Sequence, residues 1–371
     1  MIQTVHPIND PDKQVNKDYF RVSIDIGYGF VKGINERGER VLFRSIIAPA
    51  HERKIDAVFG IEEESDEIHV EIRQPGGQSN EYFVGDLALN SSHAAYAFDK
   101  NKINHPATKI LLASAYSMLT QNVNKPVHLI TGLPLDYFFV QKDQFEATLK
   151  DMSVDGIHRA GKYKGLESRV SFDKVTVFIQ GGASIYPCLM DLNGIPIRKE
   201  LMGSGELLAV ANLGFYTLDV VVFEAGKKFK PLSDLSFSVD TGVGMVELRK
   251  MAVDAFYKKT NTRLTLPQVE KILKKGGKTV FRGTEVDIGP EIQQAKENLS
   301  RVAKDHITAR LGPQFDFIHT FFWCGGGSVD LEQHLKDFHF KTEIAGDAQF
   351  ADALGYLIYG RIVEVLEKLT K

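Results

Sequence analysis

The chain has 371 residues, of which 43% are hydrophobic and 25% charged, a composition typical of a soluble globular protein. Its 45 basic and 48 acidic residues leave a net charge of -3, which offers no general attraction for nucleic acid or for an anionic membrane. Cys188 and Cys324 are too few for a disulfide framework, and no apolar run approaches the roughly 18 residues that span a bilayer. We expect a cytoplasmic protein, long enough to form two lobes with a cleft between them.

The first part of the chain predicts a sheet with an insertion. A polar tail is expected over residues 1–17, and the first strand covers RVSIDIG at 21–27. A hairpin and a further strand follow, up to Ser45. Residues 46–95 then carry short strand-like pieces and predict a small inserted subdomain. Its acidic stretch IEEESDE, at 61–67, is expected to be a solvated face or a contact with a neighbouring subunit.

Helix and strand signals alternate through the rest of the chain, as in a sheet covered by helices. The pattern of strand, turn and strand restarts at LLAVANLGFYTLDVVVF, residues 207–223. This echo of the opening strands predicts a second, related lobe. Helices are expected at 110–119, 140–149, 246–257 and 349–369 and over a long segment around 292–302, and strands at 127–134, 175–182 and 319–327.

The stretch DIGYGFVK, from Asp25 to Lys32, stands where the first strand ends. Gly27 and Gly29 let the backbone bend so that its N–H groups can face an oxyanion, and Lys32 adds a positive charge. Asp25 would repel a phosphate unless a Mg²⁺ ion lies between them, usually through water. The stretch therefore fits a phosphate loop, although an ordinary β-hairpin explains the same residues.

Two later turns also contain glycine, one in the first and three in the second. The turn NLGFYTLD, from Asn212 to Asp219, lies between two apolar strands and is placed to grip phosphate from the opposite lobe. The stretch CGGGS closes another hydrophobic strand, and its bare backbone suits a flat base or a ribose. A flexible loop is the alternative explanation. The three glycines concerned are Gly325, Gly326 and Gly327.

Two competing motifs fail on inspection. The stretch GGKT at 276–279 looks like the end of a P-loop, but position 272 is Ile where that motif needs glycine. The 11 histidines are scattered, with no HExxH and no Cys/His metal spacing. We therefore expect neither a P-loop nor a zinc site.

Six motifs in order resemble the actin superfamily: DIGYGFVK, TGLPL, FIQGG, NLGFYTLD, WCGGGS and DAQFADALGY. The resemblance is greatest to bacterial plasmid-segregation actins of the ParM/StbA type and runs from about Arg21 to the C-terminus. It implies the α/β actin/Hsp70/sugar-kinase-like fold, with two related lobes and a nucleotide cleft between them. Lobe I is then expected over 18–180 plus 345–371, and lobe II over 181–344 with a small subdomain at about 235–290.

The resemblance assigns roles by position. Asp25 and Lys32 are seven residues apart, as in the first phosphate-binding loop of actin. Gln180 matches the residue that positions the attacking water, so Gln180 and Asp25 are the implied catalytic residues, with a strand cap as the alternative for Gln180. The implied nucleotide-binding residues are Gly27, Tyr28, Gly29, Lys32, Asn212, Gly214, Thr217, Gly242, Gly325, Gly326 and Gly327.

Two residues depart from the family pattern. Tyr28 replaces the usual Ser or Thr, so backbone groups are expected to grip the phosphate there. Asn212 replaces the second metal-proximal Asp, and this loss of charge is expected to weaken Mg²⁺ binding or slow hydrolysis. Asn212 and Asp25 would then hold the metal through water. Asp219 is a candidate compensating acid, but the resemblance puts it on the strand after the turn, which favours a structural role. Replacing Asn212 by Asp is accordingly expected to speed hydrolysis.

The resemblance implies an ATP hydrolase, using ATP or GTP with Mg²⁺, that assembles into nucleotide-dependent filaments and segregates plasmid DNA. Its implied partners are further copies of itself and a DNA-binding adaptor on centromeric plasmid DNA, with no direct nucleic-acid contact and no membrane. The alternatives are a filament with another cargo, a non-filamentous sugar-kinase-like member of the superfamily, and a structural relative that binds no nucleotide.

Overall fold

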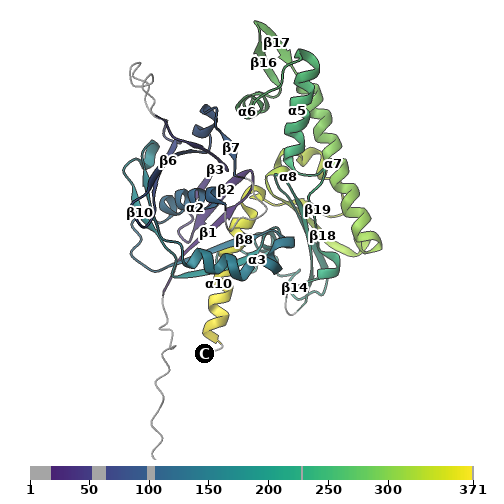
Figure 1. Cartoon of the computed structure of the whole chain (residues 1–371). Helices are drawn as coiled ribbons and strands as arrows, with labels where there is room; N and C mark the ends of the chain where they lie inside the picture. The colour runs from purple at the N-terminus through teal and green to yellow at the C-terminus, as the bar shows by residue number, and fades with distance from the viewer. Residues whose placement is uncertain (1–17, 52–63, 98–104, 227–228, 370–371) are drawn as a thin grey trace, which may run out of the picture.

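The computed structural model describes residues 18–51, 64–97, 105–226 and 229–369. The tail predicted at 1–17 and the first part of the acidic stretch therefore lie outside the described residues. Two α/β halves stand side by side, one built on the strands within residues 20–179 and one on the strands within residues 207–344 (Figure 1). Among the described residues, no helix is both long enough and apolar enough to cross a membrane.

The first half is centred on a five-stranded sheet with the order β11-β8-β1-β2-β3. Strand β1 pairs with β2 in antiparallel fashion and with β8 in parallel fashion. Every residue of β8 is buried, because helices cover the sheet on both faces. The elements are β1 (Phe20–Ile26), β2 (Phe30–Asn35), β3 (Arg40–Arg44), β8 (Val127–Leu133), β11 (Lys174–Ile179), α2 (Pro106–Leu119), α3 (Leu135–Lys150) and α10 (Ala351–Leu369).

A second sheet in this half has the order β10-β9-β5-β6-β4-β7. Four of its strands come from the segment where the sequence predicts an insertion, but β9 and β10 follow α3 and join through β5. The predicted lobe and subdomain boundaries stay a prediction. The strands are β4 (Ile46–Pro49), β5 (Ile68–Arg73), β6 (Ser79–Val84), β7 (Ala95–Tyr96), β9 (Val154–His158) and β10 (Glu167–Val170).

The second half repeats the arrangement of the first. Strand β12 pairs with β13 as an antiparallel hairpin and with β18 in parallel fashion, as β1 does with β2 and β8. The sheet order is β14-β13-β12-β18-β19, with β15 on β13. Its strands are β12 (Leu207–Leu213), β13 (Leu218–Ala225), β14 (Phe229–Pro231), β15 (Phe237–Val239), β18 (Ile318–Cys324) and β19 (Thr342–Ile344). The predicted actin-type α/β fold with two related halves is thus confirmed.

Helices and a hairpin complete the second half. Helix α7 carries its buried side chains at helical spacing, from Ile292 through Ala295 to Leu299, and packs them against the sheet of the second half. The hairpin of β16 (Lys278–Phe281) and β17 (Thr284–Asp287) projects beyond α5 and α6 (Figure 1). The helices are α4 (Ile185–Leu189), α5 (Met245–Thr260), α6 (Leu266–Lys274), α7 (Gly289–Leu311), α8 (Gly326–Asp330) and α9 (Glu332–Leu335).

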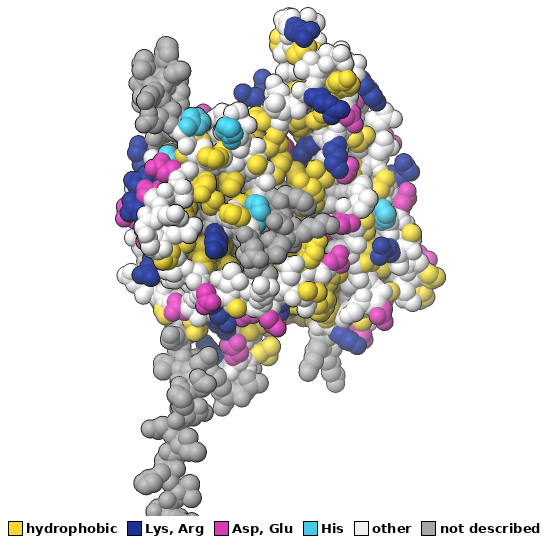
Figure 2. Space-filling view, in the orientation of Figure 1, with side chains coloured by type: hydrophobic (Ala, Val, Ile, Leu, Met, Phe, Trp, Pro, Cys, Tyr) yellow, Lys and Arg dark blue, Asp and Glu magenta, His cyan; other side chains and the backbone are white. Residues whose placement is uncertain are grey.

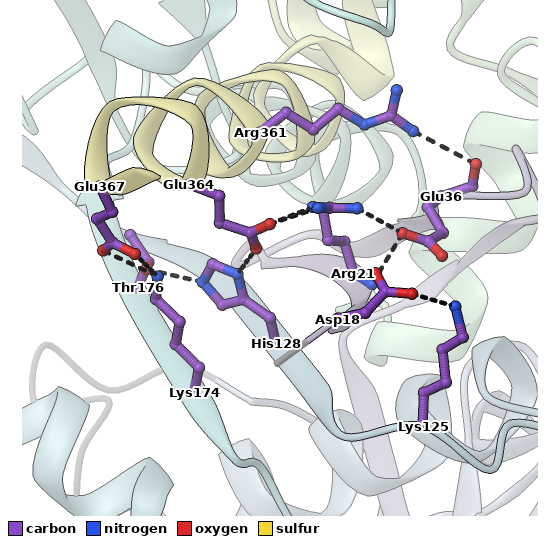
Figure 3. A network of polar contacts seen from close by, with 10 residues as sticks. All are labelled: Asp18, Arg21, Glu36, Lys125, His128, Lys174, Thr176, Arg361, Glu364 and Glu367. Atoms are coloured by element: carbon purple, nitrogen blue, oxygen red, sulfur yellow. Dashed lines mark hydrogen bonds and ion pairs between the residues drawn. The ribbon is translucent and has the colours of Figure 1, made fainter. Parts of the chain in front are cut away.

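A buried polar network ties the end of α10 to the first sheet (Figure 3). Glu364 accepts hydrogen bonds from Arg21 Nε at 3.0 Å and contacts His128 Nδ1 at 2.6 Å, while Thr176 contacts the other ring nitrogen. Burial acts to raise the pKa of Glu364, but the hydrogen bonds from His128 and Arg21 outweigh it and lower the pKa. The network holds the last helix on β1, β8 and β11.

The outer surface mixes charges of both signs. On the described part of the face in Figure 2, Lys and Arg side chains alternate with Asp and Glu, and hydrophobic side chains gather near the middle. This face therefore presents no broad basic patch of the kind that binds nucleic acid, in keeping with the near-neutral composition.

Candidate functional site

A cavity of about 330 Å³ lies between the two halves, at the ends of their central strands. All predicted site residues except Gly242 line it: Asp25, Gly27, Tyr28, Gly29, Lys32, Gln180, Asn212, Gly214, Thr217, Gly325, Gly326 and Gly327. Gly242 lies on an exposed turn before α5, with a φ of +71° and open space around its Cα. The structure thus brings residues of four sequence motifs to one place and leaves the turn at Gly242 outside it.

The first glycine turn joins β1 to β2 and faces the second half. The antiparallel register pairs Asp25 with Lys32, and the Lys32 ammonium donates to the Asp25 carboxylate at 2.8 Å. The seven-residue separation is therefore a consequence of the hairpin register. A Cβ at Gly29 would lie 2.8 Å from the ring of Phe215, so the two turns approach so closely that a side chain has no room.

Tyr28 is buried between the two turns. Its ring stands edge-on to Tyr216 of the second turn, with ring centres 5.5 Å apart, and Tyr216 in turn packs on Phe215. Phe215 also lies 4.7 Å from the ring of Tyr96. The bulky phenol that departs from the family pattern therefore forms part of an aromatic contact between the halves.

Gln180 follows β11 and reaches the cavity beside Asp25. Its side-chain amide donates to the second oxygen of Asp25 at 3.2 Å, while its backbone N–H is held by Leu133. Both oxygens of Asp25 are thus engaged, one by Lys32 and one by Gln180. Asp25 is only 2% exposed, so this pairing keeps a buried charge satisfied.

Asp352, in the first turn of α10, is a site residue that the sequence analysis missed. Its carboxylate accepts hydrogen bonds from the Gly181 N–H at 2.9 Å, the Ser184 hydroxyl at 2.7 Å and the Asn212 amide at 2.6 Å. Burial raises the pKa of Asp352 to about 7, and the nearby charge of Asp25 adds to the effect. The available signal was a single acid within the otherwise apolar run ADALGYLIYG.

The triple glycine closes β18 and begins α8. Gly325 has a φ of +84°, and a Cβ there would lie 2.4 Å from the Asn212 side-chain oxygen and 2.5 Å from the Leu213 carbonyl. A Cβ at Gly327 would lie 2.8 Å from the same carbonyl. The loop is therefore packed against the end of β12, and its glycines are needed for that close approach.

The Glu270 cluster, made of Arg44, Tyr96, Arg249 and Glu270, joins the halves at one side of the cavity. Glu270 of α6 accepts hydrogen bonds from Arg44 of β3 at 2.7 Å, Tyr96 of β7 at 2.5 Å and Arg249 of α5 at 2.6 Å. Its side chain is 3% exposed. Burial acts to raise the pKa of Glu270, but its charged and hydrogen-bonded partners outweigh burial and lower the pKa. The charge of Arg249 has the largest lowering effect. No local sequence pattern indicates this cluster, because its members come from four separate elements.

The donors at the cavity floor are oxygens, the ligands that hard divalent cations prefer. Asp25 and Asp352 supply carboxylates, and Asn212 supplies an amide. Within the described residues, no group of three His, Cys, Asp or Glu side chains could hold a metal by itself. The site therefore fits a cation that takes most of its ligands from water and from a bound phosphate. The fold and the site together define an actin-type architecture, with glycine turns from both halves facing one cavity.

Sequence comparison assigns both halves to actin-like families. Residues 23–182 match the model described as actin like proteins N terminal domain, and residues 210–337 match the model described as archaeal actin homologue MreB-like, C-terminal. An archaeal actin homologue of Thermoplasma acidophilum is 25% identical over 344 residues, which cover 90% of this chain and 97% of that protein.

Solved structures agree. The structure of a 15-stranded ParM filament from Clostridium botulinum is 28% identical with a TM-score of 0.83, and the match covers 93% of this chain and 99% of that one. An archaeal actin homologue in complex with ADP has a TM-score of 0.71 at 19% identity, over 91% of this chain and 97% of that one, and supports the fold alone. The chain belongs to the actin superfamily, and ParM proteins are among its relatives.

Proposed function

We propose that this protein is an ATP hydrolase of the actin type that binds ATP, or GTP, with Mg²⁺ in the cavity between its halves. The observation that carries the proposal is the meeting of two glycine turns from opposite sheets with Asp25, Lys32 and Gln180 at one cavity. A solved archaeal actin homologue with the same fold is a complex with ADP, and a nucleotide is accordingly the ligand that we propose for this cavity.

Each side chain has a distinct part in this proposal. Lys32 supplies positive charge to the phosphates, while Asp25 orients water in the shell of the cation. Gln180, held beside Asp25, positions the attacking water, since a neutral amide orients water but is a poor base. Mg²⁺, when bound, neutralises charge on the phosphates and on Asp25.

The proposed role is assembly into nucleotide-dependent filaments that segregate plasmid DNA. The relative whose structure is a ParM filament supports assembly, and head-to-tail contacts that do not close into a ring give open polymers. The net charge of -3 and the mixed charges on the face drawn in Figure 2 favour a DNA-binding adaptor over direct DNA contact. A filament that moves another cargo would use the same site.

A non-filamentous, sugar-kinase-like member of the superfamily is the second candidate. Glu270 and the aromatic contact at Tyr28 hold the halves together through many contacts, which would also serve an enzyme that closes on a small substrate. Sedimentation separates the two candidates. The filament predicts pelleting with Mg-ATP and little pelleting with Mg-ADP or without nucleotide, whereas a monomer in all three conditions contradicts assembly.

A further inference from the structure

Asn212 and Asp352 form a matched amide and acid at the floor of the cavity. The Asn212 amide donates to one oxygen of Asp352 at 2.6 Å, and the Ser184 hydroxyl and the Gly181 N–H donate to the other. Each of these three donors is neutral. Asp352 is 4% exposed, so the chain holds a buried carboxylate in a fixed orientation with hydrogen bonds alone.

Positions 212 and 352 can together hold one ionised carboxylate but not two. An Asp at position 212 would place its oxygens about where the amide nitrogen now lies, 2.6 Å from Asp352. Two buried carboxylates at that distance repel unless they share a proton. The neutral residue at 212 is therefore a requirement of the acid at 352, and the two identities form one unit.

Asp352 faces the same cavity as Asp25. Both carboxylates are buried and line the same cavity, so two negative charges repel each other there with little water to screen them. Asp25 has the Lys32 ammonium as a partner, whereas the hydrogen-bond donors to Asp352 carry no charge. A divalent cation entering between the two acids would offset this repulsion.

We infer that Asp352 supplies, from the C-terminal helix, the second metal-proximal carboxylate that the actin resemblance expects at position 212, and that Asn212 positions it. This inference rests on the proposed function, because it assigns a residue to the Mg²⁺–nucleotide site. It reverses the expectation that Asn212→Asp speeds hydrolysis. Position 352 thus supplies the carboxylate that the resemblance expects from position 212, and this carboxylate still lies at the floor of the cavity.

The test measures ADP affinity by calorimetry with excess Mg²⁺ and with EDTA, so that the ratio of the two affinities gives the gain due to Mg²⁺. Four variants are compared with the wild type: Asp352→Asn, Asn212→Asp, the exchange of both, and Asp347→Asn as control. Asp347 is a half-exposed acid just before α10 that pairs with Arg40 outside the cavity. The melting temperature of each variant without nucleotide reports its effect on folding.

Asp352→Asn is expected to reduce the Mg²⁺ gain roughly 10- to 100-fold, the cost of losing a group that holds the shell of a metal. Asn212→Asp is expected to lower the melting temperature, and the exchange of both residues should restore the melting temperature and the Mg²⁺ gain. Asp347→Asn should change neither. Bound Mn²⁺, followed by electron paramagnetic resonance in the presence of ADP, should show the same order.

Contrary results separate this inference from the proposed function. If Asp352→Asn keeps the wild-type Mg²⁺ gain and only its melting temperature falls, Asp352 is a structural residue. That result would overturn the inference alone. If Asp352→Asn does not fold, a folded exchange variant without the Mg²⁺ gain overturns it equally. A wild type that binds ADP without any Mg²⁺ gain overturns the inference together with the Mg²⁺ part of the proposed function. A wild type that binds no nucleotide refutes the proposed function as a whole.

Discussion

Replacing Glu270 by Gln is the change that most directly probes how the two halves are held together. The substitution keeps the shape of the side chain but removes its charge, so Arg44 and Arg249 lose the carboxylate they share. Arg44 comes from the first half and Arg249 from the second. The substitution therefore acts on a contact within one half and on a contact across the cavity at once.

The cost follows from burial. Glu270 is 3% exposed and the two arginine side chains are each 16% exposed, so little water can take the place of the carboxylate. Breaking a buried ion pair by changing one partner costs about 3 to 5 kcal/mol. We expect the lower end, about 3 kcal/mol, because the amide oxygen of Gln can still accept one hydrogen bond.

Scanning calorimetry is suited to this test, because two halves need not unfold in a single step. A loss of about 3 kcal/mol corresponds to a fall of roughly 6 °C or more for a cooperative unit of 150 to 250 residues. Asp86→Asn is the matched control, since Asp86 pairs with the same Arg44 at 2.7 Å but is 59% exposed. That surface pair is expected to contribute less than about 1 kcal/mol.

A double-mutant cycle isolates the contact across the cavity. Arg44→Met and Glu270→Gln, alone and together, should give a coupling of roughly 1 to 2 kcal/mol, within the range for residues in contact. Hydrogen exchange in α6 should be faster in Glu270→Gln than in the wild type. A melting temperature within about 1 °C of the wild type, with no coupling to Arg44, would refute the view that the Glu270 cluster holds the halves together.

Three further predictions concern other parts of the molecule. Burial lowers the pKa of His158 to about 4, below its ordinary value of 6.5, so the unfolded chain takes up the proton first and stability falls as the pH drops below about 6.5. The free energy of unfolding that His158 loses between pH 7.5 and pH 5 should be about 2 kcal/mol. Denaturant titrations of the wild type and of His158→Gln at both pH values measure this difference, and equal pH dependence in the two proteins would contradict the prediction. Glu364→Ala should lower the free energy of unfolding by about 3 kcal/mol and expose the end of α10 to proteases, because His128 and Arg21 lose a buried partner. The control Glu367→Ala changes an acid that is 51% exposed and should have neither effect. Gln180→Ala should slow phosphate release at least about tenfold while leaving ATP affinity within a factor of about three, and an unchanged rate would remove Gln180 from the proposed mechanism.

The glycine turns could be predicted because their signals are local. The register of the β1–β2 hairpin sets Asp25 opposite Lys32, and a hairpin register follows from the length of the turn. The second turn repeats the same layout between β12 and β13. Parallel pairing of β18 with β12 then brings the triple glycine to the same edge, so three motifs that are weak alone converge on one cavity.

The remaining site residues depend on tertiary packing. Asp352 reaches the cavity only because α10 packs across β1, where the Ser23 hydroxyl donates to the Ala353 carbonyl. Nothing in the sequence around Asp352 indicates that contact. Gly242 shows the opposite case: its turn precedes a helix, as a nucleotide-contacting turn can, yet Gly242 is exposed and does not line the cavity. Local chemistry could not separate the two cases.

The second sheet shows the same limit at the level of the fold. Strands β9 and β10 are short and half polar, and they lie within residues 154–170. Because more than fifty residues separate them from β6, no nearby signal in the sequence ties them to the inserted segment. Strand β9 pairs with the edge of β5 that β6 leaves free, and β10 then pairs with β9. Long-range pairing of this kind is set by the whole fold rather than by any one segment.

A structure of the protein with Mg²⁺ and a slowly hydrolysed ATP analogue is the most direct test of the proposed nucleotide site. We expect phosphates between the turn at Gly27 to Gly29 and the turn at Gly214, with the cation held through water by Asp25 and Asp352 and with Gln180 facing the terminal phosphate. A nucleotide bound elsewhere, or a cavity that stays free of nucleotide at saturating concentration, would contradict it.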